Sequence, residues 1–191
     1  MICALDCETT GLIPGRHDIL QLALVPLDDT IEPHKNIPPF RIYMKPKRFR
    51  PEDLPEISGA LIVNKIDINW VIRNGYTHDV ALDLFDKYIK QYLGKIQPLC
   101  QNYPFDSAFV KDWLGAEQYA VYFDRQYRDT YSLANALKDK ARLKGLPDPF
   151  PKSTRLTALA ESLGINIGNA HDAFFDCLTT AAVYKEMLLK F

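Results

Sequence analysis

Two acidic side chains, Asp6 and Glu8, stand two residues apart near the start of the chain. Residues 1 to 7 alternate as in a short strand, and side chains two apart in a strand project from the same face. Both carboxylates therefore point to one place, where their repulsion is relieved by a bound cation or by a raised pKa on one of them. An acidic strand end that simply faces water is equally compatible with this spacing.

A third acidic residue, Asp106, follows a short strand expected at 98 to 102. Pro104 suits the first turn of a helix that runs to about Leu114, and this places Asp106 at the helix start. Sheets in α/β proteins gather functional groups at the carboxyl ends of their strands. The alternative is an ordinary first-turn acid favoured by the helix dipole.

His171 and Asp176 lie five residues apart near the C-terminal end of the sequence. On a regular helix this spacing separates two side chains by roughly 140°, so they cannot both face one site from within a helix. They can do so if His171 precedes the helix and Asp176 lies one turn inside it. Asp172 competes as an acidic ligand, but at a helix start a capping role is simpler. A histidine that only begins a helix is the plain alternative for His171.

The elements that must position these residues follow from hydrophobic periodicity and turn residues. Three strands with short connections predict an antiparallel meander, and helices then alternate with strands. The predicted strands span residues 1 to 7, 19 to 27, 40 to 44, 98 to 102 and 121 to 123. The predicted helices span residues 77 to 93, 104 to 114, 154 to 163 and 172 to the end, with a further helix capped by Asp129. The order predicts an α/β fold whose mixed sheet is covered by helices.

The composition predicts one globular domain spanning residues 1–191. Lys and Arg total 23 against 24 Asp and Glu, so the overall charge does not indicate nucleic-acid binding. Basic residues do gather in two segments, although the residues alone favour a solvated face for each of them. The first cluster contains Lys45, Lys47, Arg48 and Arg50, and the second contains Lys138, Lys140, Arg142, Lys144, Lys152 and Arg155.

The four cysteines show no metal-binding spacing and are expected to be buried free thiols. The acidic start MICALDCETT does not fit a secretory signal, and no apolar run approaches the roughly 20 residues of a membrane span. We therefore expect a soluble protein in the reducing cytoplasm, with no membrane partner.

Taken together, the acidic segments resemble the DEDDh, or DnaQ-like, family of 3′-to-5′ exonucleases. LDCETTGL at 5 to 12 is similar to the first family motif, QNYPFDSAF at 101 to 109 to the second, and HDAFFD at 171 to 176 to the third. His171 marks the histidine branch of the family, and Asp129 with Thr130 resembles a further structural feature. Tyr103, Pro104 and Gln101 depart from the usual pattern of the second motif.

The resemblance implies a ribonuclease H-like fold with three antiparallel N-terminal strands followed by parallel strands in a mixed five-stranded sheet. It also implies two Mg²⁺ or Mn²⁺ ions, which suit all-carboxylate ligation. By this resemblance the metal ligands are Asp6, Glu8, Asp106 and Asp176. His171 is then the general base, a role that suits an imidazole because its ordinary pKa lies near 6.5. The expected products are nucleoside 5′-monophosphates released from single-stranded 3′ ends of DNA or RNA.

The same resemblance implies contacts with the substrate. Thr9, Thr10 and the neighbouring backbone are expected at the terminal 3′-OH, and Leu12 or Phe105 against the last base. Asn102 is a further expected contact, and the basic clusters are expected to hold upstream phosphates. Phe105 and Phe109 also fit an ordinary core position.

Two other classes of function compete with a free-standing exonuclease. One is a catalytically silent module that holds nucleic-acid ends or a partner protein, which the intact acids and His171 disfavour. The other is a proofreading subunit that docks on a polymerase; because the sequence ends at Phe191 directly after the last helix, we favour a free-standing enzyme. Related enzymes are often homodimers, and no sequence feature decides the oligomeric state.

Overall fold

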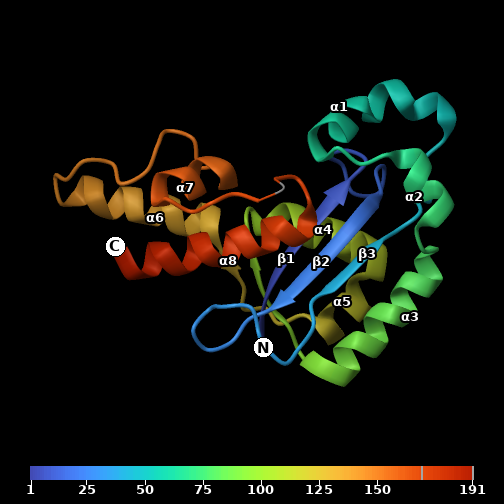
Figure 1. Ribbon diagram of the computed structural model, residues 1–191, viewed down its shortest axis with the longest axis horizontal. Helices are drawn as coiled ribbons and strands as arrows, with labels where there is room; N and C mark the ends of the chain where they lie inside the picture. Colours follow the sequence, from blue (N-terminus) through green and yellow to red (C-terminus); the bar gives the residue numbers. More distant parts are fainter. Residues whose placement is uncertain (169, 191) are drawn as a thin grey trace.

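The computed structural model describes residues 1–168 and 170–190. One five-stranded sheet runs through it in the order β3-β2-β1-β4-β5 (Figure 1). Its strands are β1 (Ile2–Thr9), β2 (Ile19–Pro26), β3 (Phe40–Tyr43), β4 (Gln97–Cys100) and β5 (Arg128–Asp129). The first three strands pair antiparallel, whereas β4 and β5 run parallel to β1. The predicted mixed sheet is therefore confirmed.

Helices cover both faces of the sheet. Helix α8 crosses one face over β1 and β2, with α6 and α7 stacked beyond it (Figure 1). The other face packs against α3, α4 and α5. These helices are α3 (His78–Tyr88), which continues as the π-helical η2 (Ile89–Leu93), α4 (Tyr103–Leu114), α5 (Ala116–Tyr122), α6 (Thr130–Leu143), α7 (Leu156–Leu163) and α8 (Ala173–Lys190).

Strand β1 divides its side chains between the two faces, as the period of two requires. Cys3, Leu5 and Cys7 join the apolar core shared with α3, α4 and α5. Ala4 instead packs with Cys177 and Ala181 of α8. The even-numbered side chains of β1, which include both acids, therefore face α8.

The expected strand at Val121–Phe123 is wrong. Residues up to Tyr122 belong to α5, Phe123 makes only an isolated bridge with Ile96, and the strand lies five residues later at β5. Tyr119 and Tyr122 are three residues apart, so one helical face buries both of them in the core around Phe85. In a short apolar run, this helical contact outweighed the preference of aromatic residues for strands.

The segment between β3 and α3 contains helices that were not predicted. They are the short η1 (Pro51–Asp53), α1 (Leu54–Asn64) and α2 (Ile68–Asn74). Asp67 begins α2 by accepting a hydrogen bond from the Asn69 N–H. Elsewhere the local signals hold: Asp129 caps α6 through the Tyr131 N–H, and Gly164 ends α7 with a positive φ.

All four cysteines are free and buried, as predicted. Among the described residues, every helix is too short or too polar to cross a lipid bilayer.

Candidate functional site

The two acids of β1 lie at its carboxyl end on the face covered by α8. Both side chains are half-buried. Asp6 feels the negative charges of Asp106, Glu8 and Asp176, so the structure gathers four carboxylates that are far apart in the sequence. The alternative of a strand end that simply faces water is thereby excluded.

Asp106 reaches this cluster from the first turn of α4. Its side chain is only 2% exposed, and its Oδ1 accepts a hydrogen bond of 3.0 Å from the backbone N–H of Cys7. Cys7 lies between the two acids of β1, so this bond fixes the third carboxylate beside the other two. A first-turn acid that serves only the helix dipole needs no such burial.

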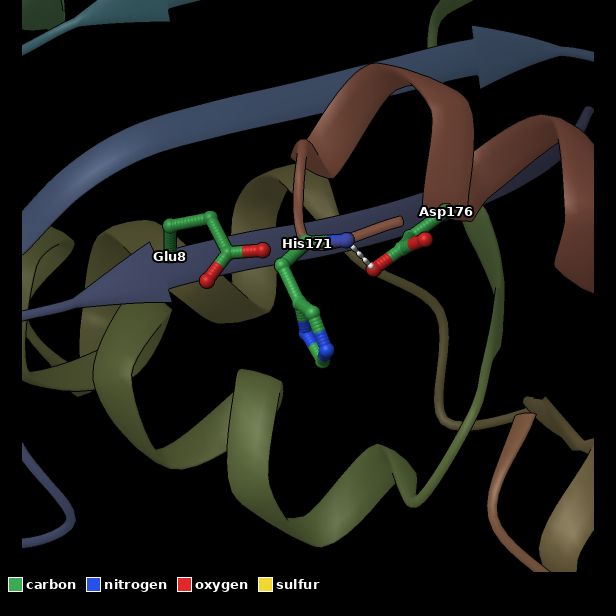
Figure 2. Close-up of side chains that lie close together, drawn as sticks. All are labelled: Glu8, His171 and Asp176. Atoms are coloured by element: carbon green, nitrogen blue, oxygen red, sulfur yellow. Dashed lines mark hydrogen bonds between the residues drawn. The ribbon is translucent and has the colours of Figure 1, made fainter. Parts of the chain in front are cut away.

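His171 lies on the chain just before α8, and Asp176 lies in the first turn of that helix (Figure 2). His171 has a positive φ of 66°, and its N–H donates to Oδ2 of Asp176 across 3.2 Å. The left-handed backbone turns the chain so that both residues lie beside Glu8. The expected arrangement, with the histidine before the helix and the acid one turn inside it, is confirmed.

The start of α8 is held by groups on β2 and β3. Gln21 Oε1 accepts a hydrogen bond of 3.0 Å from the Ala173 N–H. Asp172 Oδ1 caps the helix by accepting from the Phe174 N–H at 3.1 Å, and its other oxygen pairs with Arg41. Both Asp172 oxygens are therefore engaged, which agrees with the capping role predicted for this residue.

The electrostatics of the cluster are those of crowded acids. Burial, followed by the charge of Asp176, raises the pKa of Glu8 to about 8. Burial also raises the pKa of Asp106 to about 7, although its hydrogen bond with Cys7 opposes this shift. Burial and then the charge of Asp106 raise the pKa of Asp6, and burial raises that of Asp176. A bound cation would relieve this repulsion.

The donor set fits a divalent cation. One possible ligand atom from each of Glu8, His171 and Asp176 lies within 4.8 Å of the others, and Figure 2 shows the three side chains around a common space. Carboxylate oxygens are the ligands that Mg²⁺ and Mn²⁺ prefer, while an imidazole nitrogen also suits zinc. The residues present can therefore hold a divalent metal.

A cleft of about 550 Å³ opens beside Glu8 and lies between β1, α4 and the unpredicted α1. Three of the predicted substrate contacts line it, namely Thr9, Leu12 and Phe105. Leu12 is 78% exposed, and Phe105 packs against Phe109 at 5.0 Å between ring centroids. We call this space the nucleoside cleft after the ligand proposed for it below; its size and mixed lining suit a small ligand with polar and aromatic parts.

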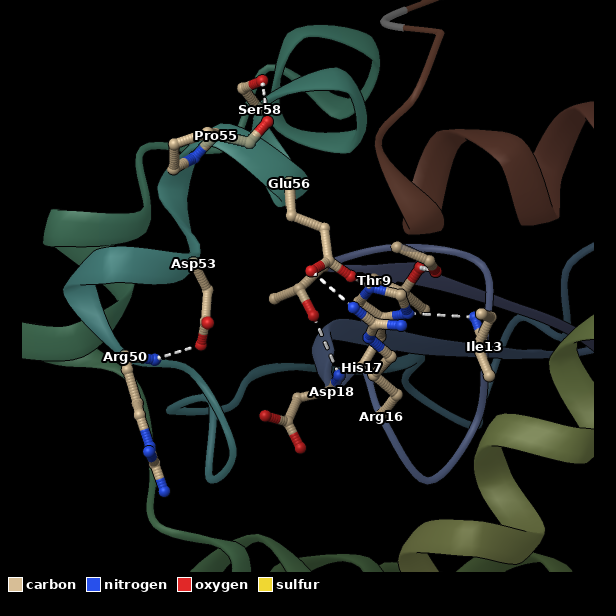
Figure 3. A network of polar contacts seen from close by, with 12 residues as sticks. Thr9, Ile13, Arg16, His17, Asp18, Arg50, Asp53, Pro55, Glu56 and Ser58 are labelled. Carbon is tan, nitrogen blue, oxygen red and sulfur yellow. Dashed lines mark hydrogen bonds and ion pairs between the residues drawn. The ribbon is translucent and has the colours of Figure 1, made fainter.

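A polar network fastens α1 to the loop after β1 (Figure 3). His17 Nδ1 accepts from the Ile13 N–H at 3.0 Å, and its Nε2 lies 3.2 Å from Oε1 of Glu56 on α1. Arg16 pairs with the second oxygen of Glu56 at 2.7 Å. At the other end of α1, Asn64 Nδ2 donates to the Thr9 carbonyl oxygen at 3.1 Å. Helix α1 is thus held as one wall of the nucleoside cleft.

The remaining two predicted contacts lie elsewhere. The Thr10 hydroxyl oxygen accepts from the Asp18 N–H at 2.9 Å, and Thr10 lines a separate hollow beside Arg16 and Arg48. Asn102 has a positive φ, and its N–H donates to Asp129 at 2.8 Å. The structure therefore brings neither residue into the nucleoside cleft.

Asn102 lines a second cleft, of about 770 Å³, on the other side of His171 and Asp176. Lys152 and Arg155 line it from the loop before α7. We call this space the basic cleft. In the first basic cluster, by contrast, Arg48 is held in ion pairs with Asp18 and Asp112 and does not line this cleft.

Helix α1 was not predicted from the sequence, and Asn64, which donates to the Thr9 carbonyl oxygen, was not identified. Their signal was present, since Ile57, Leu61 and Asn64 follow helical spacing after the prolines at 51 and 55. Gly59 and the exposed apolar residues of this segment weaken the amphipathic pattern.

Comparison with known proteins finds a family match in the first third of the chain. An exonuclease family model, RNase_T, matches residues 3–64, which include both acids of β1 and all of α1. No curated protein matches the chain in sequence. The resemblance to the exonuclease family, first seen in the motifs, is confirmed over this segment.

The fold is that of several solved nucleases. Escherichia coli Exonuclease I in complex with a dT13 oligonucleotide is 21% identical with a TM-score of 0.72, covering 96% of this chain and 40% of that one. Exonuclease I from Methylocaldum szegediense is 20% identical with a TM-score of 0.73, covering 99% and 40%. Cell-death related nuclease 4 is 21% identical with a TM-score of 0.72, covering 98% and 63%. The chain thus spans about two fifths of the Exonuclease I structures, and the ribonuclease H-like fold is confirmed.

Proposed function

We propose that this chain, with an exonuclease-family segment at 3–64 and the fold of Exonuclease I, is a metal-dependent 3′-to-5′ exonuclease. It hydrolyses the terminal phosphodiester bond of single-stranded DNA or RNA and releases a nucleoside 5′-monophosphate. The observation that carries this proposal is the meeting of four carboxylates and His171, one of which, Glu8, also lines the nucleoside cleft.

Two Mg²⁺ or Mn²⁺ ions are the proposed cofactors, held by Asp6, Glu8, Asp106 and Asp176. The raised pKa values of these acids support the assignment, because four crowded carboxylates that are buried or half-buried need a compensating charge. Bound ions supply stabilisation of the charge that develops on the attacking and leaving oxygens. The chain itself holds two of these carboxylates in place by backbone hydrogen bonds, Asp106 through the Cys7 N–H and Asp176 through the His171 N–H.

His171 is proposed as the general base. Its exposed imidazole takes a proton from the attacking water, whose oxygen forms the new bond to phosphorus. The bond from phosphorus to the 3′ oxygen of the penultimate nucleotide breaks, and that oxygen leaves with a proton from solvent. The left-handed backbone at His171 and its tether to Asp176 orient the ring for this step.

The terminal nucleoside is proposed to occupy the nucleoside cleft. Leu12 is exposed at this cleft and can lie against the last base, with Phe105 on the wall formed by α4. Thr9 lies at the inner end beside Glu8, where the terminal sugar would meet it. Asn102 is proposed to contact the strand from the basic cleft, together with Lys152 and Arg155. Thr10 is not proposed to contact the substrate; it stabilises the loop by accepting a hydrogen bond from the Asp18 N–H.

Single strands are the proposed substrate form, because the similar Exonuclease I structures are complexes with single-stranded DNA. The buried free thiols support a reducing cytoplasmic location.

The acidic residues at the nucleoside cleft provide a test of the direction in which the strand is cleaved. A 3′-phosphate would bring negative charge against Glu8 and its acidic neighbours, so binding should be opposed by repulsion. We expect 5′-labelled linear oligomers to be shortened from the 3′ end with Mg²⁺, whereas 3′-phosphorylated and circular strands resist. Asp6→Ala is the control for contaminating nucleases. Cutting of the circle that disappears in Asp6→Ala would instead establish an endonuclease, and binding without cleavage would establish the silent module.

A further inference from the structure

A third hollow, of about 360 Å³, opens on the side of His171 away from the basic cleft. We call it the Trp70 hollow. Its walls come from the end of β3, the turn between α1 and α2, and the chain before α8. The residues used below are Tyr43, Asn64, Lys65, Asp67, Trp70 and His171.

The aromatic wall of this hollow is exposed but firmly supported. The Trp70 side chain on α2 is 44% exposed and meets Tyr43 edge to face, with 5.2 Å between ring centroids. The Tyr43 hydroxyl accepts hydrogen bonds from Gln21 at 3.1 Å and from Arg41 at 2.9 Å. The tyrosine cannot turn away without losing both bonds, so Trp70 rests on a fixed ring. An indole held in this way is a platform on which a planar group can stack.

The charges of the hollow favour a neutral ring over a phosphate. Asp67 caps α2 through the Asn69 N–H, and Asp172 is paired with Arg41. Lys65, exposed at the hollow, and Arg41 balance these two carboxylates, so the hollow has no net positive charge to attract a phosphate. The basic cleft, by contrast, is lined by Lys152 and Arg155 and suits the phosphates of the strand.

The hollow adjoins the proposed active site. Asn64 lines both the hollow and the nucleoside cleft, and His171 lies at the hollow and beside Glu8 and Asp176. A nucleotide joined to one in the nucleoside cleft must pass His171 and Asn64. The Trp70 hollow presents an exposed aromatic face beside His171. The basic cleft presents another, Tyr131, but there it lies among the basic side chains that suit phosphates.

We propose that the Trp70 hollow binds the base of the nucleotide next to the terminal one, stacked on Trp70, while the phosphates follow the basic cleft. This inference rests on the proposed function, since it takes the terminal nucleoside to lie beside Glu8. Stacking on an aromatic platform tolerates any base, so the site holds the strand without selecting its sequence. The specific role of Trp70 is to set the path of the strand past His171.

Tryptophan fluorescence tests the contact without relying on turnover. The chain has two tryptophans, and the other, Trp113, packs against Phe85 at 5.4 Å between ring centroids. Trp113→Phe leaves Trp70 as the only tryptophan and keeps an aromatic ring in the core. We expect oligothymidylate, added with Ca²⁺ in place of Mg²⁺ to slow cleavage, to quench this emission to saturation. If Trp113→Phe does not fold, the difference in quenching between the wild type and Trp70→Phe provides the same measurement.

Affinity measurements identify which base is bound. We expect Trp70→Ala to weaken binding of a single strand by roughly 5- to 100-fold, the range that base stacking on an aromatic ring provides, and Trp70→Phe to weaken it less. Tyr76→Ala is the matched control, because Tyr76 is also exposed but does not line the hollow. An abasic site is then moved through the last five positions of the oligomer. At the penultimate position it should cost affinity in the wild type and cost almost nothing more in Trp70→Ala.

The outcomes separate this proposal from the proposed function. Unchanged Trp70 emission at saturating strand, equal affinities for Trp70→Ala and the wild type, or the same abasic penalties in both would overturn the Trp70 hollow while leaving 3′-end cleavage intact. Loss of the abasic penalty at a position other than the penultimate one would also overturn the assignment. If the wild type cleaves no strand under any metal condition, the proposed function itself fails.

Discussion

The backbone N–H of Cys7 donates to Oδ1 of Asp106, and this bond joins β1 to α4 in the middle of the acidic cluster. Asp106 therefore links two elements of the fold, whereas the side-chain hydrogen bond of Asp176 reaches only His171, five residues before it. We expect Asp106→Asn to keep the bond through its amide oxygen but to lower turnover by roughly 100-fold or more, because a buried charge is lost. Asp106→Ala should also leave the Cys7 N–H without a partner, at a cost of about 1–3 kcal/mol.

Single-turnover cleavage and thermal unfolding in EDTA distinguish these effects. The alanine variant should unfold at a lower temperature than the asparagine variant while both lack activity. Asp6→Ala and Glu8→Ala should lose activity with no loss of stability, since each removes repulsion. Near-normal turnover by any two of the four acid variants would contradict the proposed ligand set.

The metal-free protein should lose stability as the pH rises. The pKa of Glu8 is raised from 4.5 to about 8 and that of Asp106 from 3.8 to about 7, so the folded state holds protons that the unfolded state has released. The free energy of unfolding therefore falls from about pH 4 to about pH 8. Melting in EDTA between pH 5 and 9 should show this fall, and Glu8→Gln should flatten it. A slope that is the same in Glu8→Gln and the wild type would show that Glu8 does not titrate in this range.

The general base should leave its own signature in the rate. If His171 takes the proton, single-turnover cleavage should rise with pH and level off once the base is fully deprotonated. His171→Ala should remove this rise and lower the plateau. Because Glu8 also titrates near pH 8 without metal, saturation with Mg²⁺ must be verified at each pH. A rise that persists unchanged in His171→Ala would assign the proton transfer to another group.

The loop after β1 should be intolerant of a methyl group at Gly11. A Cβ at this position would lie 2.5 Å from the Cδ2 atom of His17, whose ring is buried and held by Ile13 and Glu56. We expect Gly11→Ala to destabilise the protein by about 1–3 kcal/mol and to raise KM more than it lowers kcat, because α1 loses its fastening. Gly59→Ala on α1 is the control for stability alone, since nothing lies within 4 Å of its Cβ but the residue lines the nucleoside cleft. Equal stability of both variants would disprove the close packing of Gly11 on His17.

The basic cleft should make binding depend on salt. Lys152→Ala and Arg155→Ala should each weaken binding of all sequences and reduce the slope of log affinity against log salt by about one if each neutralises one phosphate. Lys144→Ala serves as the control, because Lys144 is exposed and lies outside this cleft. If the salt slopes of both variants match the slope of the control, neither Lys152 nor Arg155 contacts a phosphate.

The sequence by itself determined the features that depend on neighbours along the chain. The period of a strand was enough to put Asp6 and Glu8 on one face, and the period of a helix required His171 to precede α8. Asp129 was identified as a cap from its position before a helical segment. The motifs around these residues also predicted a resemblance to the exonuclease family, confirmed over residues 3–64, and a mixed sheet, confirmed by the likeness in fold.

The tertiary structure decided where segments distant in the sequence meet. Packing of α8 across β1 brought Asp176 to Glu8, and burial around Phe85 turned the expected strand at 121 to 123 into part of a helix. Ion pairs with Asp18 and Asp112 occupy Arg48, although its sequence context suggested a phosphate contact. Neither α1 as a wall of the nucleoside cleft nor Trp70 beside His171 was visible in the sequence. Side-chain spacing specifies faces within one element, whereas these contacts depend on which faces of different elements bury each other.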